Sequence, residues 1–359
     1  MKRALGLLIL IIFIMAGCVP APEKITIDGV EKAINQSEEA VQDLKNEKNV
    51  AAVLSALPDE INTTIQGENT SLLIAANVTP PEVDTIYTAI LQPITYDEKK
   101  LVDFCFGKQA KDAVRDGSQE AYGSVQYSIP DAETQAHSIS LDLYNNGEIF
   151  YNNGALNAQY SKEVKAQQEN APHCSLSAAD AIQITKDYLK GLGIPAIDIT
   201  QVIPEVADAG AGKGFYSITF TVNYFGVPFY YRGVTNGMNP PGGSIVVAEE
   251  GIVTLSGAIL FEALNTAPVD QILSLEDILS LIPAMMNTRI KTQSDTPVIG
   301  ISLRYLIKAD ENNNPKLVPV WLFDIDQEAA KAVLGNQDEY VYRGSQDLIF
   351  NALTGELER

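Results

Sequence analysis

One local pattern recurs along this chain and restricts its fold more than any other feature: a helix-capping signature, an amphipathic helix and then strands. The first occurrence begins at Thr95-Tyr-Asp-Glu98, where Thr95 is placed to cap a helix and Glu98 to reach back to it. The second begins at Ser177 and the third at Ser274, each with an aspartate three residues later. This recurrence predicts an α+β fold built of tandem modules, each a helix packed on a small antiparallel sheet.

The segments that follow these caps carry the periodicities that the pattern requires. Apolar residues recur at helical spacing from Ile182 to Leu189, and Gly191 is placed to end that helix. After the first helix, alternating apolar residues flank Asn146-Gly147, which is a strong local signal for a β-hairpin. The third helix is expected to end near Met286 and to be followed by strands.

The last two occurrences can be laid on each other. Val227-Pro228 then matches Val318-Pro319, and Glu250-Gly251 matches Thr354-Gly355. The spacing between these landmarks differs, which requires an insertion in one copy. We interpret the match as an internal repeat, with chance similarity between strand-rich segments as the alternative.

Composition bounds the classes of function. The chain has 359 residues, of which 46% are hydrophobic, so it can bury a sizeable core. Its formal net charge is −21, which argues against nucleic-acid binding, because that requires clustered Lys and Arg. The same charge disfavours adsorption on anionic lipid through a basic face.

The amino terminus predicts the compartment. Lys2 and Arg3 precede the apolar run Ala4 to Met15, which is too short to span a bilayer and fits the core of a secretory signal peptide. The following Ala16-Gly17-Cys18 resembles the bacterial lipobox. This resemblance implies removal of residues 1–17, a diacylglycerol and acyl lipid on Cys18, and an extracytoplasmic protein anchored to the bacterial cell membrane. An ordinary signal peptide that contains a cysteine is the alternative.

The two remaining cysteines are one candidate disulfide. Outside the cytoplasmic membrane disulfides persist, so Cys105 and Cys174 can pair. Two separate buried thiols are the equally weighted alternative.

The sequence lacks the residue patterns of the common hydrolases and metal sites. The only histidines are His137 and His173, and neither belongs to a recognisable catalytic motif. His173 and Cys174 are neighbours in sequence, which rarely gives the geometry of a catalytic dyad. We therefore predict a non-enzymatic protein without a metal or cofactor.

One acidic segment resembles the start of a calcium loop. Asp310, Asn312 and Asn314 take the first three ligand positions of an EF-hand, but Pro315 and Trp321 stand where glycine and glutamate are required. A polar hairpin loop explains these residues better. Trp321, the only tryptophan, is expected in the core of the last sheet.

An aromatic strand is the one suggestive surface feature. Residues 224–231 hold five rings, and alternation along a strand sends some of them outward. Tyr224, Phe229, Tyr230 and Tyr231 are therefore candidates for a partner surface, as aromatic residues are enriched at interfaces. Packing of the same rings under the neighbouring helix is the alternative.

The carboxyl-terminal residues carry a family resemblance. Pro319-Val-Trp-Leu-Phe323 and Phe350-Asn-Ala-Leu-Thr-Gly-Glu356 are similar to the closing strands of the YycH/YycI extracytoplasmic regulators. With the preceding helix they also look like a PepSY-like unit, in which an Asn-Ala-x-Thr-Gly turn closes a hairpin. The resemblance implies a protein that restrains a membrane sensor kinase from outside. This chain departs from the YycH/YycI type by carrying a lipobox where those proteins have a transmembrane helix.

These observations together predict an organisation and a function. The predicted ranges are a signal peptide (1–17), a lipidated tether with a helix between residues 30 and 57 (18–60), an α+β domain (61–170), a PepSY-like module (171–265) and a YycI/PepSY-like module (266–359). The predicted function is binding of an extracytoplasmic protein partner at the cell envelope. A PepSY-like inhibitor of an extracellular protease and a small-ligand or solute-binding lipoprotein are the alternatives.

Overall fold

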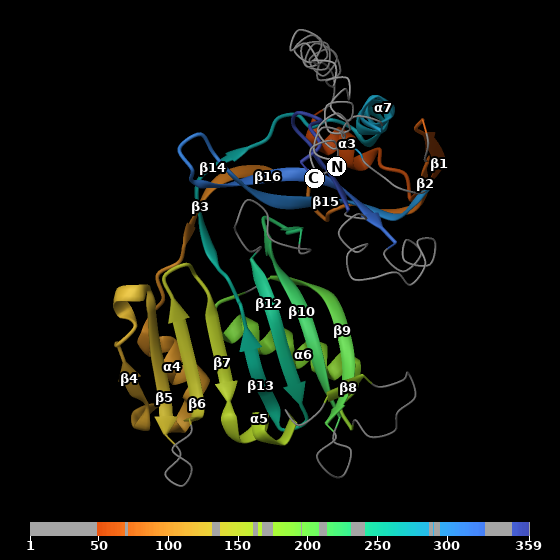
Figure 1. The fold of residues 1–359 in the computed structure, drawn as a ribbon. Helices are drawn as coiled ribbons and strands as arrows, with labels where there is room; N and C mark the ends of the chain where they lie inside the picture. The colour runs from red at the N-terminus through yellow and green to blue at the C-terminus, as the bar shows by residue number, and fades with distance from the viewer. Residues whose placement is uncertain are drawn as a thin grey trace, which may run out of the picture. The chain divides into compact units, whose positions relative to one another are not determined.

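The chain folds into two β-sheets with helices on their faces, as seen in a computed structural model (Figure 1). By its internal contacts the chain divides into residues 1–46 and 47–359, and all described residues belong to the second unit. The structure describes residues 49–68, 71–130, 137–160, 164–166, 175–194, 196–207, 214–230, 241–286, 290, 295–326 and 347–358. The signal peptide, Cys18, the predicted tether up to residue 48, Cys174 and Tyr231 lie outside these residues. Of the helix predicted between residues 30 and 57, the described part is helical from Val50 to Ser55.

The first sheet has seven strands in the order β1-β2-β15-β16-β3-β14, with β17 paired to β16. Helices α3 and α7 belong to this sheet. The elements are α3 (Val50–Ser55), β1 (Glu60–Gln66), β2 (Ser71–Thr79), β3 (Tyr87–Pro93), β14 (Phe261–Pro268), α7 (Leu275–Met285), β15 (Thr296–Ala309), β16 (Pro315–Ile325) and β17 (Leu348–Asn351).

The second sheet has ten strands in the order β4-β5-β6-β7-β13-β12-β10-β9-β8, with β11 paired to β10. Its strands are β4 (Val114–Asp116), β5 (Ser124–Pro130), β6 (His137–Tyr144), β7 (Ile149–Asn153), β8 (Val164–Ala166), β9 (Ile197–Ala207), β10 (Gly214–Tyr224), β11 (Val227–Pro228), β12 (Gly242–Ala248) and β13 (Gly251–Ser256). Its helices are α4 (Glu98–Phe106), α5 (Gly154–Tyr160) and α6 (Ala178–Gly191), with short 3₁₀ turns η1 (Gly107–Asp112) and η2 (Glu120–Tyr122).

Two equivalent units make up the ten-stranded sheet. Helix α4 is followed by β4 to β7, and α6 is followed by β9, β10, β12 and β13. In each unit the strands run from the outside of the sheet toward its centre, where β7 pairs antiparallel with β13. Helices α4 and α6 lie on the same face of this sheet (Figure 1). The predicted α+β class with antiparallel sheets is confirmed.

The core of the ten-stranded sheet lies between these two helices and the strands. The helices contribute Leu101, Phe106 and Leu189, and the strands contribute a layer of aliphatic and aromatic side chains that includes Leu141, Ile218, Phe220 and Ile245. On the opposite face, Tyr160 of α5 packs against Phe215 of β10 with ring centroids 5.4 Å apart.

The seven-stranded sheet also contains two units, but they interleave. Helix α3 precedes β1 to β3, and α7 precedes β15 to β17. Strand β15 pairs in parallel with β2, and β16 pairs antiparallel with β3, so neither unit forms a separate sheet. Trp321 of β16 is fully buried, as predicted, and its indole N–H donates to the carbonyl of Leu273 at 3.0 Å.

The predicted segment ranges do not coincide with the sheets. Residues 61–170 contribute β1, β2 and β3 to the seven-stranded sheet and their later strands to the ten-stranded one. Residues 171–265 likewise supply the ten-stranded sheet and the start of β14. The reason is non-local pairing, such as that of β2 with β15, which no local periodicity reveals.

The predicted caps are correct for two helices and wrong for the first. Ser177 accepts a bond from the N–H of Asp180 at 3.1 Å, and Ser274 forms a complete capping box with Asp277. Helix α4 is capped by Asp97 rather than by Thr95. Asp97 is itself extended and its side chain accepts the N–H of Lys100 at 3.1 Å, so α4 begins at Glu98.

The predicted hairpins are present. Strands β6 and β7 flank Asn146-Gly147, and Gly147 adopts φ = 86°, which favours glycine. Strands β15 and β16 flank the acidic loop, where the Asp310 carboxylate accepts the backbone N–H groups of Asn312 and Asn314 at 2.9 and 2.7 Å. This arrangement is the predicted polar hairpin loop.

Candidate functional site: a groove beside an edge strand

The aromatic strand predicted as a partner surface is largely buried. Phe229 and Tyr230 are 1% and 3% exposed, so the prediction is wrong for these two residues. The Phe229 ring packs against Tyr224 of β10 at 5.2 Å and against Tyr305 of β15 at 6.1 Å between centroids. The rings therefore join the two sheets of the same chain, and Tyr231 lies outside the described residues.

Hydrogen bonds reinforce this junction between the sheets. The N–H of Tyr230 donates to the carbonyl of Tyr305 at 2.9 Å. Within the seven-stranded sheet, the N–H of Tyr87 donates to the Tyr305 hydroxyl at 2.9 Å. Arg304 forms an ion pair with Asp198 of β9 at 2.8 Å. Burial raises the pKa of Tyr305 to about 12, so its hydroxyl stays neutral at physiological pH. These residues have a structural role.

Cys105 belongs to α4 and is half-buried. Its sulfur is 3.6 Å from the hydroxyl of Tyr188. Burial raises the pKa of the Cys105 thiol to about 11, which leaves little thiolate for nucleophilic chemistry at neutral pH. Because Cys174 lies outside the described residues, pairing of the two cysteines stays a prediction.

A charged cluster lies at the start of α4. The Arg115 guanidinium contacts the Glu98 carboxylate at 3.2 Å and also pairs with Glu120. The Tyr127 hydroxyl donates to Glu98, and this hydrogen bond is the main reason why the pKa of the Glu98 carboxyl lies below its ordinary value. The neighbouring hollow has a volume of about 310 Å³ and is lined in part by Tyr144. The charges of this cluster pair with one another, which favours a structural role.

Among the described residues, no group of three or more His, Cys, Asp or Glu side chains could hold a metal ion. In the same part of the chain, no helix is both long and apolar enough to cross a bilayer.

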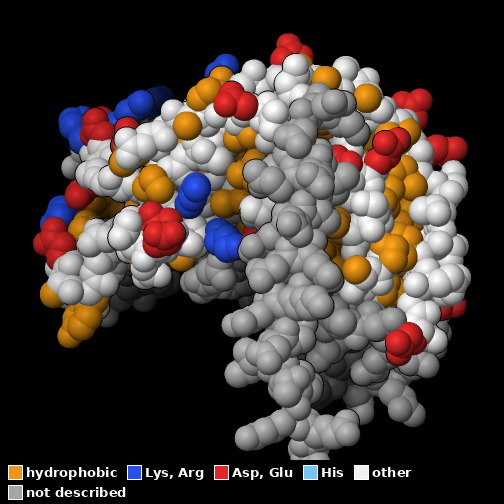
Figure 2. Space-filling view, turned by 90° about the horizontal axis from the view of Figure 1, so that it is seen from above, with side chains coloured by type: hydrophobic (Ala, Val, Ile, Leu, Met, Phe, Trp, Pro, Cys, Tyr) orange, Lys and Arg blue, Asp and Glu red, His pale blue; other side chains and the backbone are white. Residues whose placement is uncertain are grey.

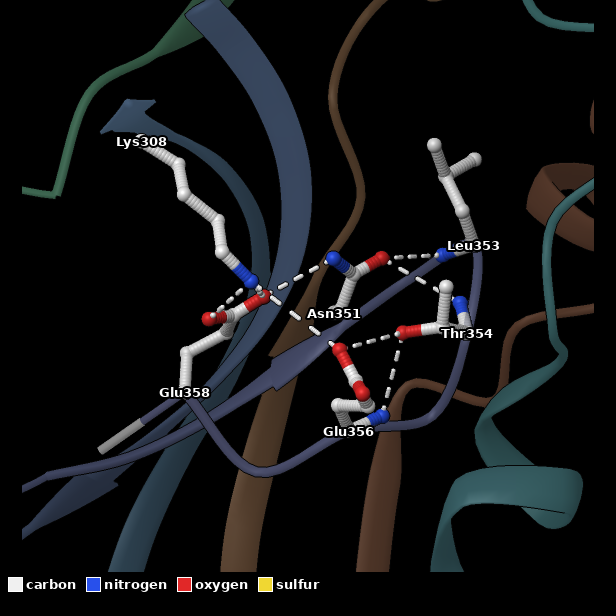
Figure 3. Close-up of polar contacts among 6 residues, drawn as sticks. All are labelled: Lys308, Asn351, Leu353, Thr354, Glu356 and Glu358. Atoms are coloured by element: carbon white, nitrogen blue, oxygen red, sulfur yellow. Dashed lines mark hydrogen bonds and ion pairs between the residues drawn. The ribbon is translucent and has the colours of Figure 1, made fainter. Parts of the chain in front are cut away.

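The carboxyl-terminal motif that carries the family resemblance forms a tight turn (Figure 3). The Asn351 side-chain oxygen accepts the backbone N–H groups of Leu353 and Thr354 at 2.9 and 3.2 Å. Its amide nitrogen donates to Glu358 at 2.8 Å, and Lys308 of β15 bonds the same carboxylate at 3.0 Å. Asn351 is buried, so this asparagine closes the hairpin rather than presenting a ligand site.

An apolar groove between α3, β1 and α7 is the strongest candidate for a binding site. Its volume is about 790 Å³. Figure 2 views the molecule from the side on which α3 and α7 lie in Figure 1, and it shows hydrophobic side chains gathered in bands among polar ones. The groove is lined by Ala52, Val53, Ala56, Leu57, Pro58, Ile61, Thr63, Ile65, Ser274, Leu275, Glu276, Leu279 and Ser280. We call it the α3–α7 groove.

The shortness of α3 leaves this groove open. Helix α3 has six residues, begins at the Asn49 cap and is soon followed by Pro58, which cannot continue a helix. Helix α7 has eleven residues, and Ile278 and Ile282 face the core while Leu279 lies at the groove. The two helices together therefore leave part of β1 uncovered.

Strand β1 forms one wall of the groove and one edge of the seven-stranded sheet. It pairs with β2 in a regular antiparallel register, and no other described strand pairs with it. The N–H of Val78 donates to the carbonyl of Asp59 at 2.9 Å. Since such bonded pairs recur every second residue, odd-numbered residues bond to β2 and the even-numbered ones, from Glu60 to Gln66, direct N–H and C=O outward.

The charged residues in and next to the described walls of the groove are acidic. Residues 49–98 contain no Lys, Arg or His, and the first basic residue after Lys48 is Lys99. Within this stretch Asp59 and Glu60 stand at the start of β1 and are exposed. Helix α7 adds Glu276 and no basic residue. The groove and its surroundings therefore suit a partner that is apolar on one side and basic on the other.

Sequence reasoning missed this site. Its three walls come from residues 52–65 and 274–280, which are more than 200 positions apart and are brought together by long-range pairings such as β2 with β15 and Asn49 with Gln271. A partial signal was present, namely a strand-like run at 60–66 without Lys, Arg or Pro inside a stretch that lacks basic residues.

The fold and the groove are those of a two-sheet α+β protein built of helix-and-strand units, with an apolar groove at a sheet edge. No known family model matches the sequence, and no curated protein does. The structure is similar to that of an uncharacterized protein from Eubacterium rectale ATCC 33656, with a TM-score of 0.57 and 16% identity over 90% of this chain and 98% of that chain. At this identity the likeness shows the fold alone.

Two further solved structures are more distant. The YpeB C-terminal domain of Bacillus megaterium matches with a TM-score of 0.36 and 13% identity, over 75% of this chain and 97% of that chain. YycH from Bacillus subtilis matches with a TM-score of 0.34 and 9% identity, over 74% of this chain and 55% of that chain. Neither likeness is close enough to carry an argument about function.

Proposed function

We propose that this chain is a non-enzymatic lipoprotein of the bacterial cell envelope that binds an extracytoplasmic protein through the α3–α7 groove. The groove carries the proposal. It is large, mostly apolar and half open, with an edge strand as one wall. Small-ligand sites place a few convergent polar groups in an enclosed cavity, whereas an open apolar groove suits a segment of another protein.

The lipid anchor and the partner class rest on the sequence. The segment that ends at Cys18 supports diacylglycerol attachment and a position outside the cytoplasmic membrane. The residues 319–323 and 350–356 resemble YycH/YycI and PepSY-like proteins, which supports regulation of a membrane sensor kinase as the finer role. Inhibition of an extracellular protease is the alternative that the same resemblance supports. Neither role requires a metal or cofactor.

Site-directed photo-crosslinking in intact cells tests the binding role. A photoreactive phenylalanine analogue replaces Ala56, which is exposed and lines the groove, in the full-length chain. The matched control carries the same analogue at Tyr122, which is 84% exposed and belongs to the ten-stranded sheet region. We expect one extracytoplasmic protein to crosslink from position 56 and not from position 122, and a further Leu279→Asn change to reduce its yield.

The identity of the crosslinked protein separates the two roles. A sensor kinase supports the regulatory role, and a secreted or membrane protease supports inhibition. Equal crosslinking from both positions, or none from position 56 in cells where the chain is lipidated and folded, would contradict the proposal. Replacing Cys18 by Ala provides the separate test of the anchor, because it should release the chain from the membrane fraction.

A further inference from the structure

We infer that the groove and the outer edge of β1 together bind an extended, basic segment of the partner by β-strand addition. This inference rests on the proposed function, since it takes the α3–α7 groove as the partner surface. It adds the chemical class of the segment: a strand of about seven residues with apolar side chains on one face and Lys or Arg on the other.

The backbone of β1 supplies the first part of the argument. Even-numbered residues from Glu60 to Gln66 direct their N–H and C=O groups away from β2. The register with β2 is regular over all seven pairs and contains no bulge. An incoming strand can therefore bond to this edge along its whole length.

The side chains of β1 supply the second part. Ile61, Thr63 and Ile65 line the groove, while the alternate side chains Asn62 and Thr64 are exposed on the other face. An added strand continues the pleat of the sheet, so every second one of its side chains would enter the groove. These side chains would be apolar, because Leu57 and Leu279 form the facing walls.

Charge supplies the third part. The opposite face of the added strand lies beside β1 residues that include Glu60, in a stretch of 50 residues without a basic side chain. A natural edge strand is commonly protected by an inward-pointing lysine, a proline or a bulge. Strand β1 contains no Lys, Arg or Pro. The absence of these protective features leaves the edge open to pairing, and the acidic side chains favour a basic strand over an acidic one.

Peptide binding to the full-length chain in detergent micelles tests the inference. The probe is a fluorescein-labelled peptide of four Lys-Val repeats, followed by fluorescence anisotropy. A Glu-Val peptide and a peptide with the lysines and valines in separate blocks are the composition controls. We expect each control to bind at least about tenfold more weakly, because one loses charge complementarity and the other loses the alternation.

Backbone methylation of the peptide separates strand addition from groove binding alone. N-methylation of every second residue removes the N–H groups on one edge of the peptide. We expect one methylated set to abolish binding and the other to be tolerated, with the lysine set sensitive in an antiparallel pairing and the valine set in a parallel one. Tolerance of both sets would overturn strand addition.

Variants of the chain provide the matching test. Asn62→Pro removes an outward N–H without touching the ladder to β2, and Asn62→Thr at the same position keeps that N–H. We expect Asn62→Pro to weaken peptide binding about tenfold or more and Asn62→Thr to leave it unchanged. Circular dichroism checks that both variants fold. If Asn62→Pro does not fold, the methylated peptides still test the inference with the unchanged chain.

The outcomes distinguish this inference from the proposed function. If Asn62→Pro leaves crosslinking from position 56 intact while Leu279→Asn abolishes it, the groove binds a partner without strand addition, and only this inference fails. If neither variant reduces crosslinking from position 56, the α3–α7 groove is not the partner surface, and the proposed function fails as well. Sedimentation velocity tests a second copy of this chain as the occupant. A dimer that becomes monomeric on Asn62→Pro would show that β1 pairs with another copy, and would contradict a basic partner segment.

Discussion

The two sheets differ in the length and regularity of their edge strands. The ten-stranded sheet ends in β4 and β8, which have three residues each and contain Arg115 and Lys165. The seven-stranded sheet ends in β14, whose pairing with β3 is interrupted by a register shift after Leu264, and in β1, which is regular and has seven residues. Short, charged or irregular edges resist pairing, so β1 alone among these four edges is suited to accept another strand.

The units within the two sheets explain this difference. In the ten-stranded sheet the helices α4 and α6 have nine and fourteen residues and cover one face of the strands. In the seven-stranded sheet α7 has eleven residues, but α3 has six. One helix-and-strand architecture therefore gives a covered sheet where both helices are long and an open groove where one is short.

The largest effect is expected from Trp321→Ala in the seven-stranded sheet. Trp321 is fully buried, and its indole N–H bonds the carbonyl of Leu273 just before α7. Loss of this ring should lower the free energy of unfolding by about 3–5 kcal/mol, as measured by urea denaturation. Phe220→Ala, at 1% exposure in the ten-stranded sheet, is the matched change. Two separate transitions would show that the sheets unfold independently, whereas one shifted transition would show that they form a single cooperative unit.

A smaller effect is expected from Tyr224→Phe at the junction of the sheets. The Tyr224 hydroxyl donates to the carbonyl of Phe261 and accepts its N–H at 3.0 Å. The residue opposite Phe261 is Pro93, which has no N–H to offer that carbonyl. Removing the hydroxyl should therefore lower the free energy of unfolding by about 1–3 kcal/mol.

Tyr122→Phe is the control for this change, since Tyr122 is largely exposed and should tolerate loss of its hydroxyl. Equal stability of Tyr224→Phe and the unchanged chain would contradict a structural role for the Tyr224 hydroxyl.

Local signals in the sequence were sufficient for much of the fold. Ser177 and Ser274 cap helices because each side chain accepts the backbone N–H of the aspartate three residues later, and at Ser274 the aspartate completes a capping box. Asn146-Gly147 forms a turn because glycine accepts the positive φ found there. Thr95 failed as a cap because Asp97, two residues later, accepts the N–H of Lys100 and sets the start of α4. Sequence therefore predicted features that depend on neighbours within a few residues.

The site was harder to predict for the same physical reason. The run at 224–231 reads as one half-exposed strand, yet β10 ends at Tyr224, Phe225 and Gly226 form a turn, and Tyr305 of a distant strand packs against the buried Phe229. The α3–α7 groove depends on the parallel pairing of β2 with β15, which carries no local periodicity. Burial by distant segments is thus what separated the predicted surface from the observed one.

The N-caps of α6 and α7 allow a finer comparison of the two sheets. Ser274 and Asp277 are buried, and the Asp277 carboxylate accepts the N–H of Ser274 at 2.8 Å. The corresponding Ser177 on α6 is exposed. Ser274→Ala should therefore lower the free energy of unfolding by about 1–2 kcal/mol, and Ser177→Ala by about 0.5 kcal/mol. Chemical denaturation of the two variants measures both values, and a larger effect at Ser177 would contradict the role assigned to burial.

The smallest effect is expected from acid titration of Glu98 in the ten-stranded sheet region. The Tyr127 hydroxyl and then Arg115 hold the pKa of Glu98 below its ordinary value. A lowered pKa in the folded state means that Glu98 stabilises the fold above the pKa it has when unfolded, about 4.3, and that this stabilisation is lost as the pH falls through the lower folded value. The difference in stability between the unchanged chain and Glu98→Gln should therefore be present at pH 6 and shrink toward pH 3.

Asp310 provides the counterpart of Glu98 in the seven-stranded sheet. The backbone N–H of Asn314 is the main cause that lowers the pKa of Asp310, and the charge of Lys316 is the smallest of the causes. Salt screens charge pairs more than it weakens backbone hydrogen bonds, so 0.5 M NaCl should reduce the effect of Glu98→Gln more than that of Asp310→Asn. Equal salt dependence of the two variants, measured by urea denaturation at pH 6, would show that Arg115 contributes little to holding Glu98 ionised.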